Sequence, residues 1–121
     1  MEAPVSFNEL DRQQREWDAR AGAAQAAGGQ AYDRLLTLAE GRASGQIHRI
    51  ARFLASTYNG EVFPFDCFEL RAVDVDISDD MLVCLDALRW AKADLYKLVP
   101  DGERRVLAVL EAWGIAWPDL S

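Results

Sequence analysis

The clearest helical pattern of the chain lies in the segment Ser78-Asp79-Asp80-Met81-Leu82-Val83-Cys84-Leu85-Asp86-Ala87-Leu88. Its first residue is of a type that caps helix N-termini, and the positive end of the helix dipole favours carboxylates in the turn that follows. The apolar residues that we expect to face the core are Met81, Leu82, Cys84, Leu85 and Leu88. We therefore predict a helix that starts after Ser78 and ends near Trp90 or Ala91.

The sequence before this segment predicts three more helices. Ser6 and Glu9 have the spacing of a capping box, so we expect a first helix from about residue 7 to residue 24. Gly22, Gly28 and Gly29 follow among alanines, and because glycine weakens a helix we expect a connector there that can bend. Apolar residues at helical spacing then predict helices over residues 31–41 and 47–58.

The remaining elements are shorter. Asp66 and Asp94 each resemble a helix start, and each is expected to open one or two turns. A last helix is predicted over residues 103–113, capped by Gly114, with Ile115, Trp117 and Pro118 as an extended tail over the core.

These patterns predict an all-α fold in a single small protein. The 121 residues, half of them hydrophobic, are enough for one core, and Pro64 argues against a sheet. We predict a globular helical bundle of five or six helices, two of them short, with no heptad pattern sustained beyond two turns. Residues 1–30 would form the N-terminal helix and its Ala/Gly-rich connector, and residues 31–121 the helical globular domain.

The net charge of −7 comes from one segment of the chain. Residues 61–86 contain eight acidic residues and the single base Arg71, whereas the acids and bases on either side cancel. The eight acidic residues are Glu61, Asp66, Glu69, Asp74, Asp76, Asp79, Asp80 and Asp86. Such a segment is either a solvated face or a binding surface for a basic protein, and Arg49 and Arg52 are expected to pair with some of these carboxylates or to rest on the surface.

No motif for catalysis or metal binding stands out. His48 is the only histidine, and with Cys67 and Cys84 it falls short of a zinc site, so we expect no metal and no cofactor. Both cysteines are expected to be buried thiols. Ser44 lies four residues before His48, which leaves open a small enzyme centred on this histidine, but our prediction is a protein that is not an enzyme.

Composition also limits the partners and the compartment. The sequence pI of about 4.6 argues against direct binding of nucleic acid. No apolar run approaches the roughly twenty residues that cross a bilayer, and the charged N-terminal residues do not resemble a secretion signal, so we expect no membrane contact and a cytoplasmic location.

Several short motifs resemble a known group of proteins. They are Phe53-Leu54, Tyr58-Asn59-Gly60, Phe63-Pro64-Phe65-Asp66, Leu70-Arg71, Val73-Asp74, Leu95-Tyr96, Pro100-Asp101-Gly102 and Trp113-Gly114. Over residues 47–115 the chain resembles an uncharacterised family of small bacterial proteins encoded on integrative elements, phages and plasmids. The resemblance implies an α-helical fold and a mobile-element setting, and no activity.

Two functions follow as expectations. The first is a non-enzymatic, acidic protein-interaction module of a mobile element or phage. Its eight carboxylates would dock on a basic, nucleic-acid-binding surface of a host complex, as in anti-CRISPR or DNA-mimic inhibitors. The alternative is a structural or regulatory homo-oligomer, such as a homodimer, that uses Phe7, Leu10 and Trp17 of the N-terminal helix as its interface.

Overall fold

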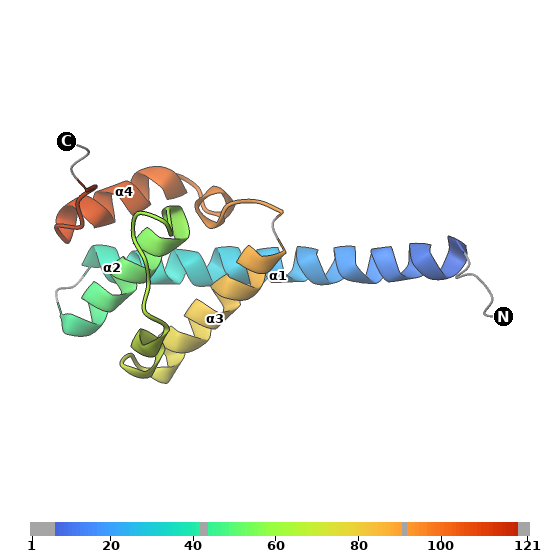
Figure 1. Cartoon of the computed structure of the whole chain (residues 1–121), viewed down its shortest axis with the longest axis horizontal. Coiled ribbons are helices and arrows are strands. Elements are labelled where there is room, and N and C mark those ends of the chain that lie inside the picture. Colours follow the sequence, from blue (N-terminus) through green and yellow to red (C-terminus); the bar gives the residue numbers. More distant parts are fainter. Residues whose placement is uncertain (1–6, 42–43, 91, 119–121) are drawn as a thin grey trace.

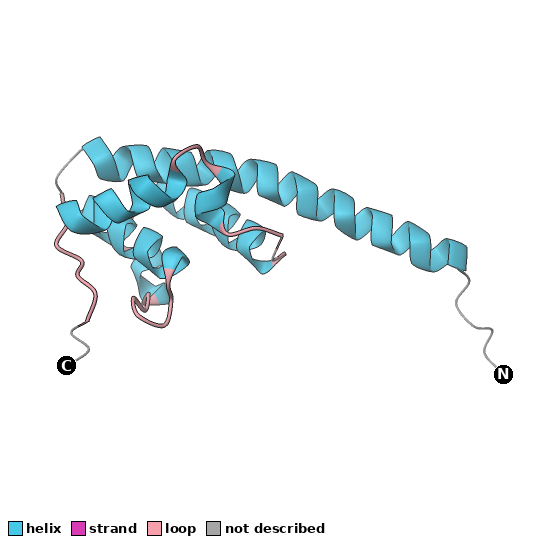
Figure 2. Cartoon of the chain, turned by 90° about the horizontal axis from the view of Figure 1, so that it is seen from above, coloured by secondary structure: helices cyan, strands magenta, loops and turns pink. Residues whose placement is uncertain are grey.

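The part of the chain that the structure describes forms four α-helices and two short 3-10 turns (Figure 1). The computed structural model describes residues 7–41, 44–90 and 92–118. In order, the elements are α1 (Phe7–Gly41), α2 (Gly45–Tyr58), η1 (Cys67–Arg71), α3 (Val75–Arg89), η2 (Leu95–Leu98) and α4 (Gly102–Ala112). None of the described residues forms a strand (Figure 2), so the all-α prediction is confirmed. The prediction of five or six helices is wrong, since the described residues form four α-helices and two short 3-10 turns.

Helix α1 is the element that departs most from expectation. It runs without interruption through residues 22–30, where we expected a connector, and so joins two predicted helices into one of 35 residues. Alanines around the glycines are the best helix formers, and they offset the cost of glycine. Packing also requires Gly28, because a Cβ there would lie 2.4 Å from the Cβ of Ala87 in α3. The expected cap, Ser6, lies outside the described residues.

The core lies where α2, α3 and α4 pack around the C-terminal half of α1. Its fully buried side chains include Tyr32, Leu35, Leu36, Ile50, Phe53, Leu54, Met81 and Val106. The hydroxyl group of Tyr32 is satisfied inside this core by a 2.8 Å hydrogen bond with the hydroxyl of Thr57 in α2. At the surface, Arg105 of α4 joins α1 through ion pairs with Asp33 and Glu40.

Helix α3 begins earlier than predicted and buries fewer leucines. Its N-cap is Asp74, four residues before the expected Ser78, whose hydroxyl instead donates to the carbonyl of Val75. The buried face consists of Ile77, Met81, Cys84 and Ala87. Leu82, Leu85 and Leu88, which we expected in the core, are exposed, because α1 covers only one side of this helix. The end at Arg89, with Trp90 as C-cap, confirms the prediction.

The remaining turns agree with the sequence patterns. The Asp66 carboxylate caps η1 by accepting the N–H of Phe68 at 2.9 Å, and Gly114 ends α4 with a φ of 69°. The tail then returns over the core, where the Trp117 ring lies 5.0 Å from that of Phe63. None of the described helices combines the length and the apolar character needed to span a membrane.

Candidate interaction site

The first half of α1, defined as residues 7–20, is not covered by any other helix that the structure describes. Every residue from 7 to 20 is exposed, and burial begins at Ala21. In Figure 1 this half, drawn in blue, projects well beyond the other helices. Phe7, Leu10 and Trp17, the predicted interface residues, are 90%, 50% and 44% exposed. The helix therefore presents large apolar side chains to solvent.

Local contacts support the projecting helix only weakly. Arg15 donates to Asp11 at 3.0 Å and Gln14 donates to Asp18 at 3.1 Å, each pair one helical turn apart. Such pairs contribute about 0.2–0.5 kcal/mol each, and an isolated helix shorter than roughly 12–15 residues is marginal in water. A binding partner would supply the burial that this segment lacks.

Aromatic and charged side chains mark the place where the covered half of α1 ends. The guanidinium of Arg20 lies 5.2 Å from the ring centre of Trp90, and the guanidinium of Arg89 lies 4.7 Å from the same ring centre. Asp18 forms an ion pair with Lys92 at 3.7 Å. Beside them, α1 and α3 enclose a groove of about 470 Å³ with an apolar floor of Ala23, Ala24, Ala27, Leu82 and Val83.

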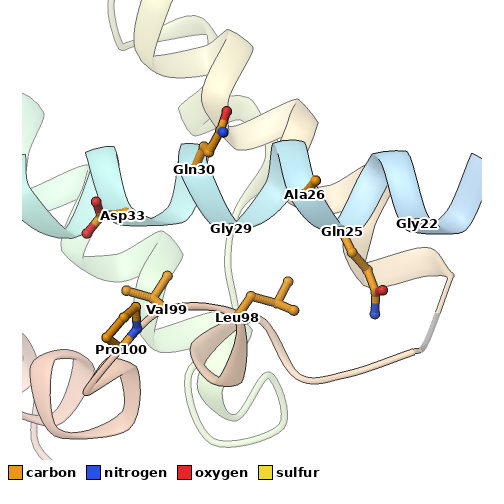
Figure 3. Close-up of a pocket in the computed structure, with 9 residues that line it drawn as sticks. All are labelled: Gly22, Gln25, Ala26, Gly29, Gln30, Asp33, Leu98, Val99 and Pro100. Carbon is orange, nitrogen blue, oxygen red and sulfur yellow. The ribbon is translucent and has the colours of Figure 1, made fainter.

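A second groove follows the opposite side of α1 (Figure 3). It measures about 490 Å³ and lies between α1 and the segment around η2. Its lining residues are Gly22, Gln25, Ala26, Gly29, Gln30, Asp33, Leu98, Val99 and Pro100. Asp33 is already paired with Arg105 at 2.6 Å, and the lining contains no histidine, cysteine or serine. The lining of this groove therefore contains no serine or cysteine paired with a histidine.

Arginines of the same chain neutralise part of the acidic segment. Glu69 pairs with Arg49 at 2.7 Å and with Arg52 at 3.8 Å, which confirms the expected pairing. Asp80 accepts two hydrogen bonds from Arg34 of α1, at 2.8 and 3.0 Å. Asp86 pairs with Arg89 at 2.6 Å.

The other five predicted carboxylates remain without an ion pair among the described residues. Two have polar partners within the fold, since Asp66 caps η1 and Asp74 accepts a hydrogen bond from Gln46 at 3.2 Å. Glu61, Asp76 and Asp79 are exposed. Asp74, Asp76 and Asp79 are brought together at the start of α3, whereas Glu61 lies in the turn that follows α2.

Ser44 and His48, the residues considered for catalysis, each make a contact within the fold. The hydroxyl of Ser44 accepts the N–H of Ile47 as the N-cap of α2, whereas the ring of His48 stacks on Trp113 at 5.5 Å. Burial raises the pKa of Cys84 to about 12, with a further contribution from Asp80. Cys67, which we expected to be buried, is exposed. Within the described ranges, no group of three or more His, Cys, Asp or Glu side chains is placed to hold a metal ion.

Comparison with known proteins connects this fold to one family. Neither the search of curated proteins nor the search of solved structures found a match to the chain. Residues 29–114 match a family of unknown function, DUF7673, and this region contains most of the globule, without the first covered turns of α1 and the tail after Gly114. The match begins at residue 29, earlier than the expected 47, and it ends close to the expected 115. With well over half of its length matched, the chain belongs to this family of unknown function.

Proposed function

We propose that the protein is a non-enzymatic protein-interaction module whose contact surface is the projecting half of α1. The observation that carries this proposal is the exposure of Phe7, Leu10 and Trp17 in residues 7–20 of α1, which no other described helix covers. Trp and other aromatic residues are the side chains that most often dominate binding energy at interfaces. Amphipathic helices commonly bind by placing such side chains in an apolar groove of the partner.

Co-purification tests this proposal. The tagged full-length chain is compared with a Phe7→Glu/Trp17→Glu variant, and with an Asn8→Glu/Ala19→Glu control that adds the same two charges to the opposite face of the helix. We expect the wild type and the control to retain bound proteins, among them a differently tagged copy, and the Phe7→Glu/Trp17→Glu variant to lose them. Equal retention by all three chains would contradict the proposal.

The acidic segment supports a second candidate function. Asp74, Asp76 and Asp79 carry negative charge at the start of α3, and no arginine among the described residues neutralises them. A basic, nucleic-acid-binding host protein would be their partner, as in DNA-mimic or anti-CRISPR inhibitors of a mobile element. For this function, binding should weaken steeply with salt and be lost in Asp76→Lys/Asp79→Lys, which leaves the paired Asp80 intact. Binding that is unaffected by salt and by both substitutions would exclude this candidate.

A further inference from the structure

One face of α1 carries a continuous stripe that the globule covers for only part of its length. Its members alternate at spacings of three and four residues: Phe7, Leu10, Gln14, Trp17, Ala21, Ala24, Gly28, Ala31 and Leu35. From Ala21 onward every member is buried, whereas the first four are exposed. Helices that pack side by side, as in coiled coils, contact each other through residues at this spacing. The exposed residues thus continue a packing surface already in use.

Helix α3 covers the second half of this stripe and runs antiparallel to α1. As the residue number falls along α1, the number of its contact in α3 rises. The pairs are Arg34 with Asp80, Gly28 with Ala87, and Arg20 with Trp90. Trp90 is the C-cap of α3. The covering helix therefore ends where the large exposed residues of the stripe begin.

We infer that the first half of α1 from a second copy of this chain covers the exposed stripe, also antiparallel, and forms a two-fold symmetric dimer. This inference rests on the proposed function and names its partner. An antiparallel overlap centred near residue 12 places Phe7 opposite the partner's Trp17 and Leu10 opposite the partner's Gln14. The stripe is therefore self-complementary, as an interface between identical subunits must be.

The arrangement satisfies the steric and electrostatic conditions of the fold. A parallel pair would bring both globules to the same end of the helices, where α3 already occupies the stripe. Asp11 flanks the stripe close to the two-fold axis, and its charge is neutralised within its own helix by Arg15 at 3.0 Å. Phe7 and Trp17 of the two copies are four aromatic side chains that bury roughly 150–250 Å² each. The buried area is then on the order of 1,000 Å², the lower limit for a specific interface. The dimer should accordingly dissociate on dilution.

Sedimentation equilibrium of the full-length chain across a wide concentration range tests self-association. We expect the mass to rise from 13.5 kDa toward twice that value, and the Phe7→Glu/Trp17→Glu variant to remain at 13.5 kDa. The Asn8→Glu/Ala19→Glu control should dimerise like the wild type. A wild type that stays monomeric at every concentration overturns this inference, while the proposed function stands if the stripe variant alone loses a different bound protein.

Disulfide cross-linking tests the orientation of the helices. In a Cys67→Ser background, which removes the exposed native thiol, Gln13→Cys should form a disulfide between the two copies. The reason is that residue 13 flanks the stripe near the two-fold axis. Phe7→Cys should not form one, because its two copies would lie roughly 15 Å apart along the helices, beyond the reach of a disulfide. Efficient cross-linking through Phe7→Cys, with none through Gln13→Cys, overturns the antiparallel arrangement.

Discussion

Gly102 occupies a position in which no side chain fits. It is the first residue of α4, and a Cβ there would lie 1.9 Å from the carbonyl oxygen of Tyr96 in η2. The contact is with backbone, which cannot rotate away as a side chain can. At Gly22 in the middle of α1, by contrast, a Cβ would have no neighbour within 4 Å.

The two glycines should therefore respond in opposite directions to the same substitution. We expect Gly102→Ala to lower the free energy of unfolding by about 3 kcal/mol, because α4 must separate from η2. Gly22→Ala should raise it by about 0.5–1 kcal/mol, because alanine loses less entropy in a helix. Urea denaturation of both variants checks the pair, and equal effects would show that the close approach at Gly102 is not maintained in solution.

The buried thiol of Cys84 should make stability depend on alkaline pH. Burial raises its pKa to about 12, whereas in the unfolded chain it ionises near its ordinary value of about 8.5. Above that pH the unfolded state binds fewer protons than the folded state, so the free energy of unfolding falls by up to about 1.4 kcal/mol per pH unit. Tyr32, whose pKa burial also raises, adds to this loss above pH about 10.

Urea titrations between pH about 8.5 and 10 on the wild type and on Cys84→Ala measure the effect. The variant is expected to be less stable at neutral pH but to lose less stability as the pH rises. Parallel pH profiles would mean that the thiol ionises equally in both states.

At the scale of elements, Arg105 is the main polar link between α4 and α1. Its guanidinium donates to Asp33 at 2.6 Å and to both oxygens of Glu40 at 2.7 and 3.0 Å, and its side chain is only 17% exposed. Three short, charge-assisted hydrogen bonds hold this side chain in one geometry. Among the described residues, the neighbouring Arg104 pairs only with Asp101, and its side chain is 72% exposed.

The two adjacent arginines provide a matched test of this link. Arg105→Ala should lower the free energy of unfolding by about 2 kcal/mol, because Asp33 and Glu40 lose their shared cation. Arg104→Ala should change it by less than about 0.5 kcal/mol. Lysine at position 105 should recover only part of the loss, because one ammonium group cannot reproduce the forked contacts. Chemical denaturation in low salt compares the three variants. Similar losses of stability in both alanine variants would show that Arg105 is not the main polar link between α4 and α1.

For the whole molecule, the long helix separates folding from association. Residues 7–20 contribute nothing to the buried core, so removing residues 1–19 should leave the globule folded with the same circular dichroism per residue of its helices. Association through these residues would, however, make the wild-type chain more stable at higher concentration, because only the folded chain can dimerise.

The melting temperature of the full chain should therefore rise with protein concentration, and that of the truncated chain should not. Calorimetry at low and high concentration makes the comparison. A truncated chain that fails to fold would show that the projecting helix supports the globule in cis.

Local sequence patterns were sufficient for the type and ends of most elements. The helical spacing in residues 47–58, the Asp66 cap and the stop at Gly114 depend on neighbours within a few residues, and all three agree with the structure. The sequence does not make the stripe of α1 conspicuous, because its middle members are alanine and glycine, which contribute little to an apolar pattern. Its regular spacing through Ala21, Ala24 and Gly28 was the signal that could have revealed it.

The sequence alone determined that the chain is helical and that its negative charge is confined to residues 61–86, because helical propensity and charge are properties of neighbouring residues. Only the tertiary structure decided which carboxylates are neutralised and which apolar side chains stay exposed. Asp80 meets Arg34 across 46 residues of sequence, and α3 covers α1 only as far as Arg20. Burial and ion pairing depend on where distant segments end in space, and no local pattern specifies that position.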